Sequence, residues 1–260
     1  MKITLAQIGC VAGDAAGNAS KIIASARQAK ASSLVIFPEL TVSGPEPYAF
    51  LKDEGFIAQC EQALDRIAHE CETIPVLVGC PVRNTTGQGK PLFNAAVYMF
   101  QGQRFVFKKK QLSAAEAEFF EPSDQDTVLQ VGCHKYAVTI GDDLTNTSQD
   151  EFLLSNRVDE LMPLAPDVIL NISAEKCGLR SSARRRNDMR MNVLKSERPL
   201  VFVNAVADKK EATYDGGSMI FGYESYVVAS APFFEESVLD VNLECLISMR
   251  HVDEQEDYTL

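Results

Sequence analysis

A short apolar run that ends in a proline and a carboxylate constrains this chain more than any other stretch. Residues 34–37 read Leu-Val-Ile-Phe, and Pro38 and Glu39 follow directly. The run lacks the alternation of a half-exposed strand, so it predicts a strand buried on both faces. In an α/β sheet the functional crevice lies beyond the carboxyl ends of the strands, where a partly desolvated Glu39 would act as a general base. An isolated glutamate is also typical of an exposed loop, so this hypothesis depends on the other strand ends.

Composition limits the classes of protein to which the chain can belong. With 260 residues, 46% of them hydrophobic, we expect one large α/β domain over residues 1–260. A formal net charge of −11 disfavours a nucleic-acid partner or an anionic membrane surface. We expect neither a signal peptide nor a membrane span. The seven scattered cysteines lack CxxC spacing, which indicates a reducing, cytoplasmic environment and no zinc site.

Hydrophobic periodicity predicts alternating strands and helices. A first strand at 2–8 is followed by helical spacing from Asn18 to about Ala31, so the chain opens as a β-α-β unit with a right-handed crossover. The clearest helical period runs from Phe56 to Cys71. Further strands are predicted at 75–80, 127–131, 135–140, 167–173 and 199–205, and within 226–250. Strands at 92–100 and 104–108 are predicted to form a hairpin, and a further helix is predicted at about 182–197.

Charged residues collect where these strands end. Gly141-Asp142-Asp143 follows strand 135–140, and Lys108-Lys109-Lys110 ends the hairpin. For two of those three lysines a solvated strand end is the simpler interpretation. Arg184-Arg185-Arg186 is interpreted as a solvated first helical turn, with an anion site as the alternative.

Several chemistries are disfavoured by what the sequence lacks. The three histidines, His69, His134 and His251, do not follow a predicted strand beside a carboxylate, so a Ser-His-Asp triad or a histidine-ligated metal is not expected. Neither GxxxxGK[ST] nor GxGxxG after a strand occurs, so nucleotide sites of those kinds and a cofactor are not predicted.

The ordered strand-end motifs resemble the nitrilase, or carbon–nitrogen hydrolase, superfamily. They are Phe37-Pro38-Glu39-Leu40, Phe107-x-Lys109-x-x-Leu112 and Ile140-x-Asp142-Asp143. The resemblance implies a four-layer α-β-β-α sandwich with mixed sheets and a Glu-Lys-Cys triad. Within the superfamily, four details are similar to the glutaminase domains of glutamine-dependent NAD synthetases: Ala6-Gln7 with Gly13-Asp14 and Asn18, Pro38-Glu39-Leu40 with Ser43-Gly44, Leu92-Phe93-Asn94-Ala95-Ala96, and Tyr214-Asp215-Gly216-Gly217-Ser218.

The resemblance also implies roles for individual residues. Glu39 takes the general-base position, Lys109 the lysine that stabilises the oxyanion, and Glu116 the auxiliary glutamate. On the substrate side the corresponding residues are Asp142, Ser173, Glu175 and Arg180. We therefore expect the heads of Glu39, Lys109 and Glu116 to converge near the backbone of residue 141.

The third member of the triad is missing. Gly141 stands where the resemblance places the nucleophilic cysteine, and glycine has no side chain with which to form a thioester. Cys133 precedes its strand, at the wrong end. Cys177, in the loop after Ser173, is the only other cysteine expected on the correct rim.

Further departures concern the substrate. Pro45 replaces a tyrosine usual in the synthetase glutaminases, and Glu175 replaces a small serine. Glu175 would repel the α-carboxylate of glutamine, although Arg180 could offset this.

Two hypotheses about function follow. The first is an amidase that releases ammonia from a glutamine-like amide for a synthetase on a separate chain, and the second is an inactive relative that serves as a scaffold or regulatory partner. The resemblance implies a homo-oligomer in either case.

Overall fold

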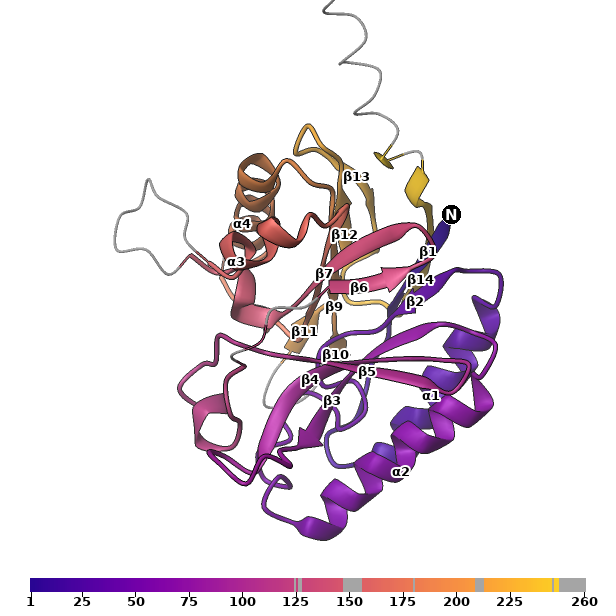
Figure 1. Cartoon of the computed structure of the whole chain (residues 1–260), viewed down its shortest axis with the longest axis vertical. Helices are drawn as coiled ribbons and strands as arrows, with labels where there is room; N and C mark the ends of the chain where they lie inside the picture. Colours follow the sequence, from indigo (N-terminus) through magenta and orange to yellow (C-terminus); the bar gives the residue numbers. More distant parts are fainter. Residues whose placement is uncertain are drawn as a thin grey trace, which may run out of the picture.

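The protein is a sandwich of two β-sheets with helices on both outer faces, and Figure 1 shows this arrangement. The computed structural model describes residues 1–123, 125, 128–146, 156–179, 181–208, 213–244 and 246–247. Its four layers are those of the α-β-β-α architecture expected from the sequence. Within the described part of the chain, no helix is long and apolar enough to cross a membrane.

The first sheet has six strands, of which the central three are parallel. Their parallel pairing follows from the β-α-β opening predicted by the sequence. In spatial order the strands are β14 (Ser237–Asn242), β1 (Lys2–Gln7), β2 (Leu34–Ile36), β3 (Val76–Arg83), β4 (Leu92–Phe100) and β5 (Gln103–Lys108). The predicted hairpin is β4–β5, which pairs antiparallel from Ala95 opposite Lys108 to Phe100 opposite Gln103.

The second sheet also has six strands with a parallel centre, formed by β7, β8 and β9. Its spatial order is β13 (Val227–Ser230), β12 (Met219–Phe221), β9 (Leu200–Asn204), β8 (Val168–Ser173), β7 (His134–Ile140) and β6 (Val128–Val131). A separate two-stranded ribbon pairs β10 (Val206–Asp208) with β11 (Thr213–Asp215).

The helices form the two outer layers. On the first sheet lie α1 (Ala15–Gln28) and α2 (Glu54–Glu70), and near the second lie α3 (Val158–Leu161) and α4 (Ser181–Ser196). The described residues also form three 3₁₀ turns, which are η1 (Glu116–Glu118), η2 (Gly141–Leu144) and η3 (Met162–Leu164). The first helix begins three residues before the predicted Asn18 because the Asp14 side chain caps it by accepting from Gly17 N.

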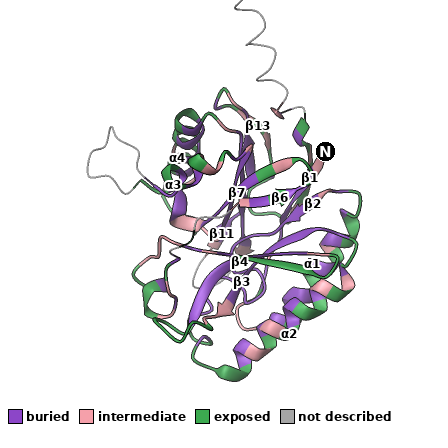
Figure 2. Ribbon diagram, in the orientation of Figure 1, coloured by how far each residue is buried: buried purple, intermediate pink, exposed green. Residues whose placement is uncertain are grey.

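The strand before Glu39 is buried on both faces, as predicted. Leu34 and Ile36 pack in the layer between the two sheets, together with Val138 and Val201 of the second sheet. Val35 and Phe37 pack on the other side, against the cluster that contains the apolar faces of α1 and α2. Figure 2 shows the buried inner sides of these helices. Because β2 is fixed from both sides, the residues that follow it start from a rigid position.

The chain leaves β2 through a tight passage over β3. Leu40 adopts a left-handed backbone with φ of 52°, and Gly79 N donates to Pro38 O over 3.2 Å. A Cβ atom on Gly79 would lie 2.3 Å from Leu40 N and 2.4 Å from Pro38 O, distances that no side chain tolerates. Glycine at position 79 therefore permits the backbone approach that places Glu39.

We expect Gly79→Ala to lower the free energy of unfolding by about 3 kcal/mol, because the added methyl collides with backbone and not with a movable side chain. Urea denaturation followed by circular dichroism measures this change. Gly178→Ala is the matched control, since its Cβ would meet no atom closer than 3.8 Å, and its effect should stay within about 0.5 kcal/mol. Equal stability of the two variants would contradict the close approach at Gly79.

Candidate active site

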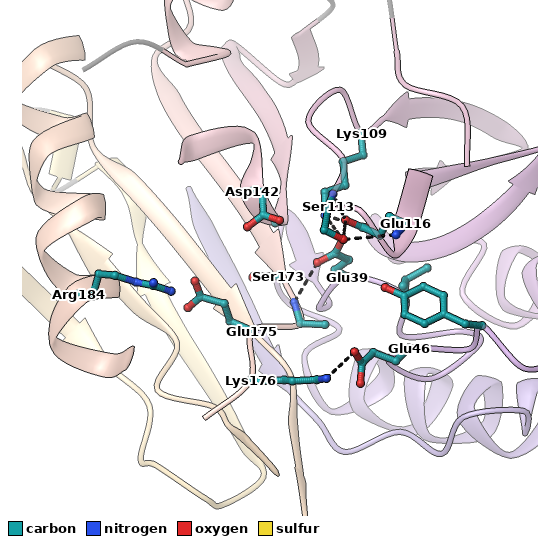
Figure 3. A pocket seen from close by; sticks show the side chains of 14 residues that line it. Glu39, Glu46, Lys109, Ser113, Glu116, Asp142, Ser173, Glu175, Lys176 and Arg184 are labelled. Carbon is teal, nitrogen blue, oxygen red and sulfur yellow. Dashed lines mark hydrogen bonds and ion pairs between the residues drawn. The ribbon is translucent and has the colours of Figure 1, made fainter. Parts of the chain in front are cut away.

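A cavity of about 300 Å³ opens where strands of both sheets end, and Figure 3 shows its side chains. Glu39 enters it after β2, Lys109 after β5 and Gly141 after β7. Ser173 and Glu175 enter from the end of β8 and the loop beyond. The strand-end residues singled out by the sequence therefore share one space.

Lys109 is the centre of a buried ionic cluster. Its Nζ lies 2.9 Å from Glu39 Oε1 and 2.8 Å from Glu116 Oε1, and only 3% of its side chain is exposed. Asn94 Nδ2, from β4, donates to the same two oxygens over 2.7 and 2.9 Å. The cluster thus joins four parts of the chain in one hydrogen-bonded unit: the segments after β2 and β5, the turn η1, and strand β4. The convergence of Glu39, Lys109 and Glu116 is the one that the resemblance implied.

The second oxygen of each glutamate is also held. Glu39 Oε2 accepts from the N of Ala174, which directly follows β8 of the second sheet, over 3.1 Å. Glu116 Oε2 accepts from both the backbone N and the Oγ of Ser113, each over 2.9 Å. These contacts fix both carboxylates in orientation, so neither can turn away from Lys109 without losing a hydrogen bond.

The pKa values of the two glutamates shift in opposite directions. Burial raises the pKa of Glu39 above its ordinary value, and this outweighs the attraction of Lys109. Burial also acts to raise the pKa of Glu116, but Lys109 and the Ser113 hydrogen bonds together hold it below its ordinary value. Burial opposes the charge of Lys109, yet the two carboxylates raise the pKa of its ammonium group. The cluster therefore offers one carboxylate suited to take up a proton beside a permanently charged lysine.

Gly141 begins η2 directly above this cluster. Its φ is 49°, and a Cβ on it would lie 2.7 Å from Lys109 Nζ and 2.8 Å from Glu39 Oε2. Asn171 Nδ2, from β8, donates to the Gly141 carbonyl oxygen over 3.2 Å. The heads of the lysine and the glutamate thus occupy the space beside the α-carbon that a side chain at position 141 would need.

The acidic pair after Gly141 divides between two tasks. Asp142 lines the cavity. Asp143 is fully buried and accepts from the backbone N atoms of Lys110, Gln111 and Ile140 over 3.0, 2.8 and 3.0 Å. Asp143 therefore attaches the segment that carries Lys109 to the end of β7, a structural task that the sequence did not reveal.

The opposite wall contains a buried arginine that corrects one prediction. Arg185 was expected in a solvated turn, yet it is fully buried, with Nε paired to Glu175 and Nη2 2.9 Å from Asp215 Oδ1. Its Nη1 also donates to Gly216 O over 3.1 Å. The prediction was wrong because the helix directs position 185 inward, together with Met189 and Val193. Arg184 and Arg186 are exposed, as expected.

This contact also changes how Glu175 is interpreted. Its counter-charge is Arg185, whereas the expected Arg180 lies outside the described residues. Cys177 is exposed in the loop beyond, its N donating to Thr213 O over 2.8 Å, and it does not line the cavity. Among the described residues, no group of three or more His, Cys, Asp or Glu side chains is placed to hold a metal ion.

A family model described as carbon–nitrogen hydrolase matches residues 2–250. The chain is 31% identical over 255 residues to the glutamine-dependent NAD(+) synthetase of Synechocystis sp., covering 91% of this chain but only 45% of that one. The same kind of synthetase from Acinetobacter baumannii superposes with a TM-score of 0.83 at 26% identity, over 92% of this chain and 44% of that one.

A full-length match of the fold comes from a smaller protein. An amidase of the nitrilase superfamily from Nesterenkonia AN1 superposes with a TM-score of 0.79 at 18% identity, covering 100% of this chain and 97% of that chain. The amidase therefore shares the four-layer fold. By contrast, the present chain spans less than half the length of the synthetases that it matches.

Removing the positive charge of Arg185 should destabilise the fold. We expect Arg185→Met to lower the free energy of unfolding by about 3–5 kcal/mol, because Asp215 would remain buried without its cation. Chemical denaturation at neutral pH measures the loss. Arg184→Met, at an exposed position of the same helix, is the control and should change stability by less than about 0.5 kcal/mol. Adding Asp215→Asn to Arg185→Met should recover part of the loss; no recovery would contradict the ionic origin.

Removing the positive charge of Lys109 should make stability depend on pH. In Lys109→Met, burial and mutual repulsion would raise the pKa of both Glu39 and Glu116 above the unfolded value of about 4.3. The native state then binds more protons than the unfolded state, so the free energy of unfolding falls as pH rises above that value. We expect the deficit relative to the parent to be larger at pH 8 than at pH 5, in denaturation curves at both pH values. Lys110→Met, which removes a half-buried surface ion pair with Glu160, should show no such trend.

Proposed function

Because the chain belongs to the carbon–nitrogen hydrolase family, we propose that it binds a small amide beside Lys109 without forming a covalent intermediate, and that it acts as a regulatory or scaffold partner. The observation that carries this proposal is the surroundings of Gly141. No thiol or hydroxyl exists at that position, and the space beside its α-carbon is taken by Lys109 and Glu39. We interpret Gly141 as the place of the family's nucleophile.

The other hydroxyl and thiol groups near the cavity support the same interpretation. The residues that line it include no cysteine. Ser113 donates its hydroxyl to Glu116, which has a lowered pKa and is a poor proton acceptor. Ser173 and Tyr48 also line the cavity, but within the described residues neither hydroxyl is hydrogen-bonded to Glu39, and burial raises the pKa of the Tyr48 phenol. Covalent catalysis needs a nucleophile next to a base, and Glu39 has no such neighbour in position 141.

The remaining cluster is suited to bind an amide. An ammonium group carries three N–H donors, and the two glutamates use two of those on Lys109. The third is available for the carbonyl oxygen of a ligand. A carboxylate is an acceptor with several lone pairs, so Glu39 can also accept from the N–H₂ group of the same amide. Binding of this kind uses the cluster as it stands, with no reaction required.

A second candidate is an amidase that releases ammonia from a glutamine-like amide for a synthetase on another chain. The intact cluster of Glu39, Lys109 and Glu116 favours it, because a binding protein does not require both carboxylates. The names of the relatives also favour it, since these are glutamine-dependent synthetases. The absent nucleophile is the observation against it.

Restoring a thiol separates the two candidates. We expect the parent to release ammonia from glutamine no faster than Lys109→Ala. We expect Gly141→Cys to react rapidly with iodoacetamide near neutral pH, once the ends of the Lys109 and Glu39 side chains shift to admit the new side chain. Lys109 would lower the pKa of the new thiol and Glu39 would accept its proton. We expect little or no glutamine turnover by this variant, because Glu175, although paired with Arg185, still places a carboxylate in the cavity wall; Pro45 is buried and does not line the cavity. A coupled ammonia assay and intact mass measure the two results.

The alkylation is best measured in a Cys133→Ser/Cys177→Ser background, which removes the two exposed thiols of the described chain. Adding Lys109→Met to Gly141→Cys should slow the alkylation by about tenfold, the effect of losing the neighbouring cation on thiol pKa. Robust ammonia release by Gly141→Cys would establish the amidase candidate instead. Turnover by the parent that disappears in Ser173→Ala or Cys177→Ala would reveal another nucleophile and defeat the proposal.

A further inference from the structure

A second cavity lies on α4, and it belongs to none of the chemistry described above. Its volume is about 360 Å³, and it shares no lining residue with the cavity around Lys109. Figure 1 shows α4 in the outer layer, remote from α1 and α2. The lining residues are Ser182, Ala183, Arg186, Asn187 and Arg190 of α4, with Phe233.

Phe233 forms an aromatic wall that is fixed in place. Its backbone pairs with Gly216, and Phe234 N donates to Asp215 O over 2.9 Å. The ring lies so close to Gly217 that a Cβ there would come within 2.3 Å of it. The side chain is nevertheless 40% exposed. A held, accessible aromatic ring is a surface on which a flat ligand can stack.

The other wall is positively charged. Arg186 and Arg190 are four residues apart, so both point from the same side of the helix. Within the described chain Arg186 forms no ion pair, and Arg190 Nε makes only a long hydrogen bond of 3.4 Å to Ser225 Oγ. No acidic residue lines this cavity, although the chain as a whole has a net charge of −11. The guanidinium groups of Arg186 and Arg190 are therefore not neutralised by a carboxylate of the described chain, and both can bind an anionic ligand.

The chemistry of the two walls defines one class of ligand. Guanidinium groups match the geometry of phosphate oxygens and bind them in pairs. The first-turn residues Ser182 and Ala183 add the positive end of the helix dipole. Stacking on an aromatic ring suits a nucleobase, which is flat and has two π-faces. The cavity volume is also within the range of small-ligand sites.

We propose that this cavity binds a nucleotide-like aromatic anion, with its phosphate between Arg186 and Arg190 and its ring on Phe233. The site does not depend on the amide chemistry proposed for Lys109. An anion without a ring would use only the arginines, and a neutral nucleoside only the ring. Both should therefore bind more weakly than a molecule that combines them.

Adenosine 5′-monophosphate is the probe, with adenosine and inorganic phosphate as its two halves. In calorimetric titrations of the full chain at low salt, we expect the nucleotide to bind at least about tenfold more tightly than either half. Arg186→Gln and Arg190→Gln should each weaken nucleotide binding by about tenfold or more, as expected for a lost hydrogen bond to a charged group. Phe233→Leu should weaken nucleotide binding similarly but leave phosphate binding unchanged.

Two matched variants locate the site. Arg27→Gln removes an equivalent charge from α1, where Arg27 pairs with Glu70, and should leave nucleotide binding unchanged. Arg184→Gln alters the cavity around Lys109 and should also leave it unchanged. The proposal is overturned if the nucleotide and phosphate bind equally, if Arg184→Gln weakens binding as much as Arg186→Gln, or if the Arg186→Gln/Arg190→Gln double variant binds like the parent. The arginine variants lie on the surface, so the test does not depend on Phe233→Leu folding.

Discussion

The buried ammonium group of Lys109 is the interaction on which the arrangement of the site depends. A charge that is 3% exposed is tolerated only when hydrogen-bonded counter-charges offset its desolvation, and Glu39 and Glu116 provide them. Their second oxygens accept hydrogen bonds from Ala174, directly after β8 of the other sheet, and from Ser113 beside η1. The ionic cluster thus connects the edge of one sheet to the other at the place where the hydrophobic layers end. Removing one member of the cluster would leave a buried charge without its counter-charge, so Glu39 and Lys109 have a structural task in addition to any chemical one.

The fold could be predicted in large part because its local signals agree with its packing. Val35 and Phe37 face the helices while Leu34 and Ile36 face the other sheet, so an apolar run without alternation was an accurate sign of a strand between two layers. The Asp14 cap was a visible signal for an earlier helix start that the apolar period alone did not give. The ordered strand-end motifs also placed Glu39, Lys109 and Glu116 correctly in one cavity.

The unpredicted part of the site consists of partners that are distant in sequence. Arg185 resembles its neighbours Arg184 and Arg186 in a run of three, and only the spacing to Met189 and Val193 indicates an inward direction. Whether a buried arginine is possible there depends on Glu175 and Asp215, which no local pattern connects to it. Asp143 is similar: it looks like one half of an acidic pair, but its hydrogen bonds reach back to Lys110 and Gln111 across the sandwich. A satisfied buried charge is a property of three-dimensional pairing, so sequence periodicity cannot supply it.

The three consecutive arginines of α4 have a consequence for communication within the molecule. Successive residues of a helix point about 100° apart, so Arg184 faces one cavity, Arg185 enters the interior and Arg186 faces the other cavity. Arg185 holds Glu175 at the first cavity and the Asp215–Gly216 turn beside Phe233 at the second. A small rotation of this helix would therefore move a wall of each cavity at once. A ligand in the first cavity that favours one position of the helix would then change the affinity of the second cavity for its own ligand by some factor. Thermodynamic reciprocity requires the ligand of the second cavity to change the affinity of the first by that same factor.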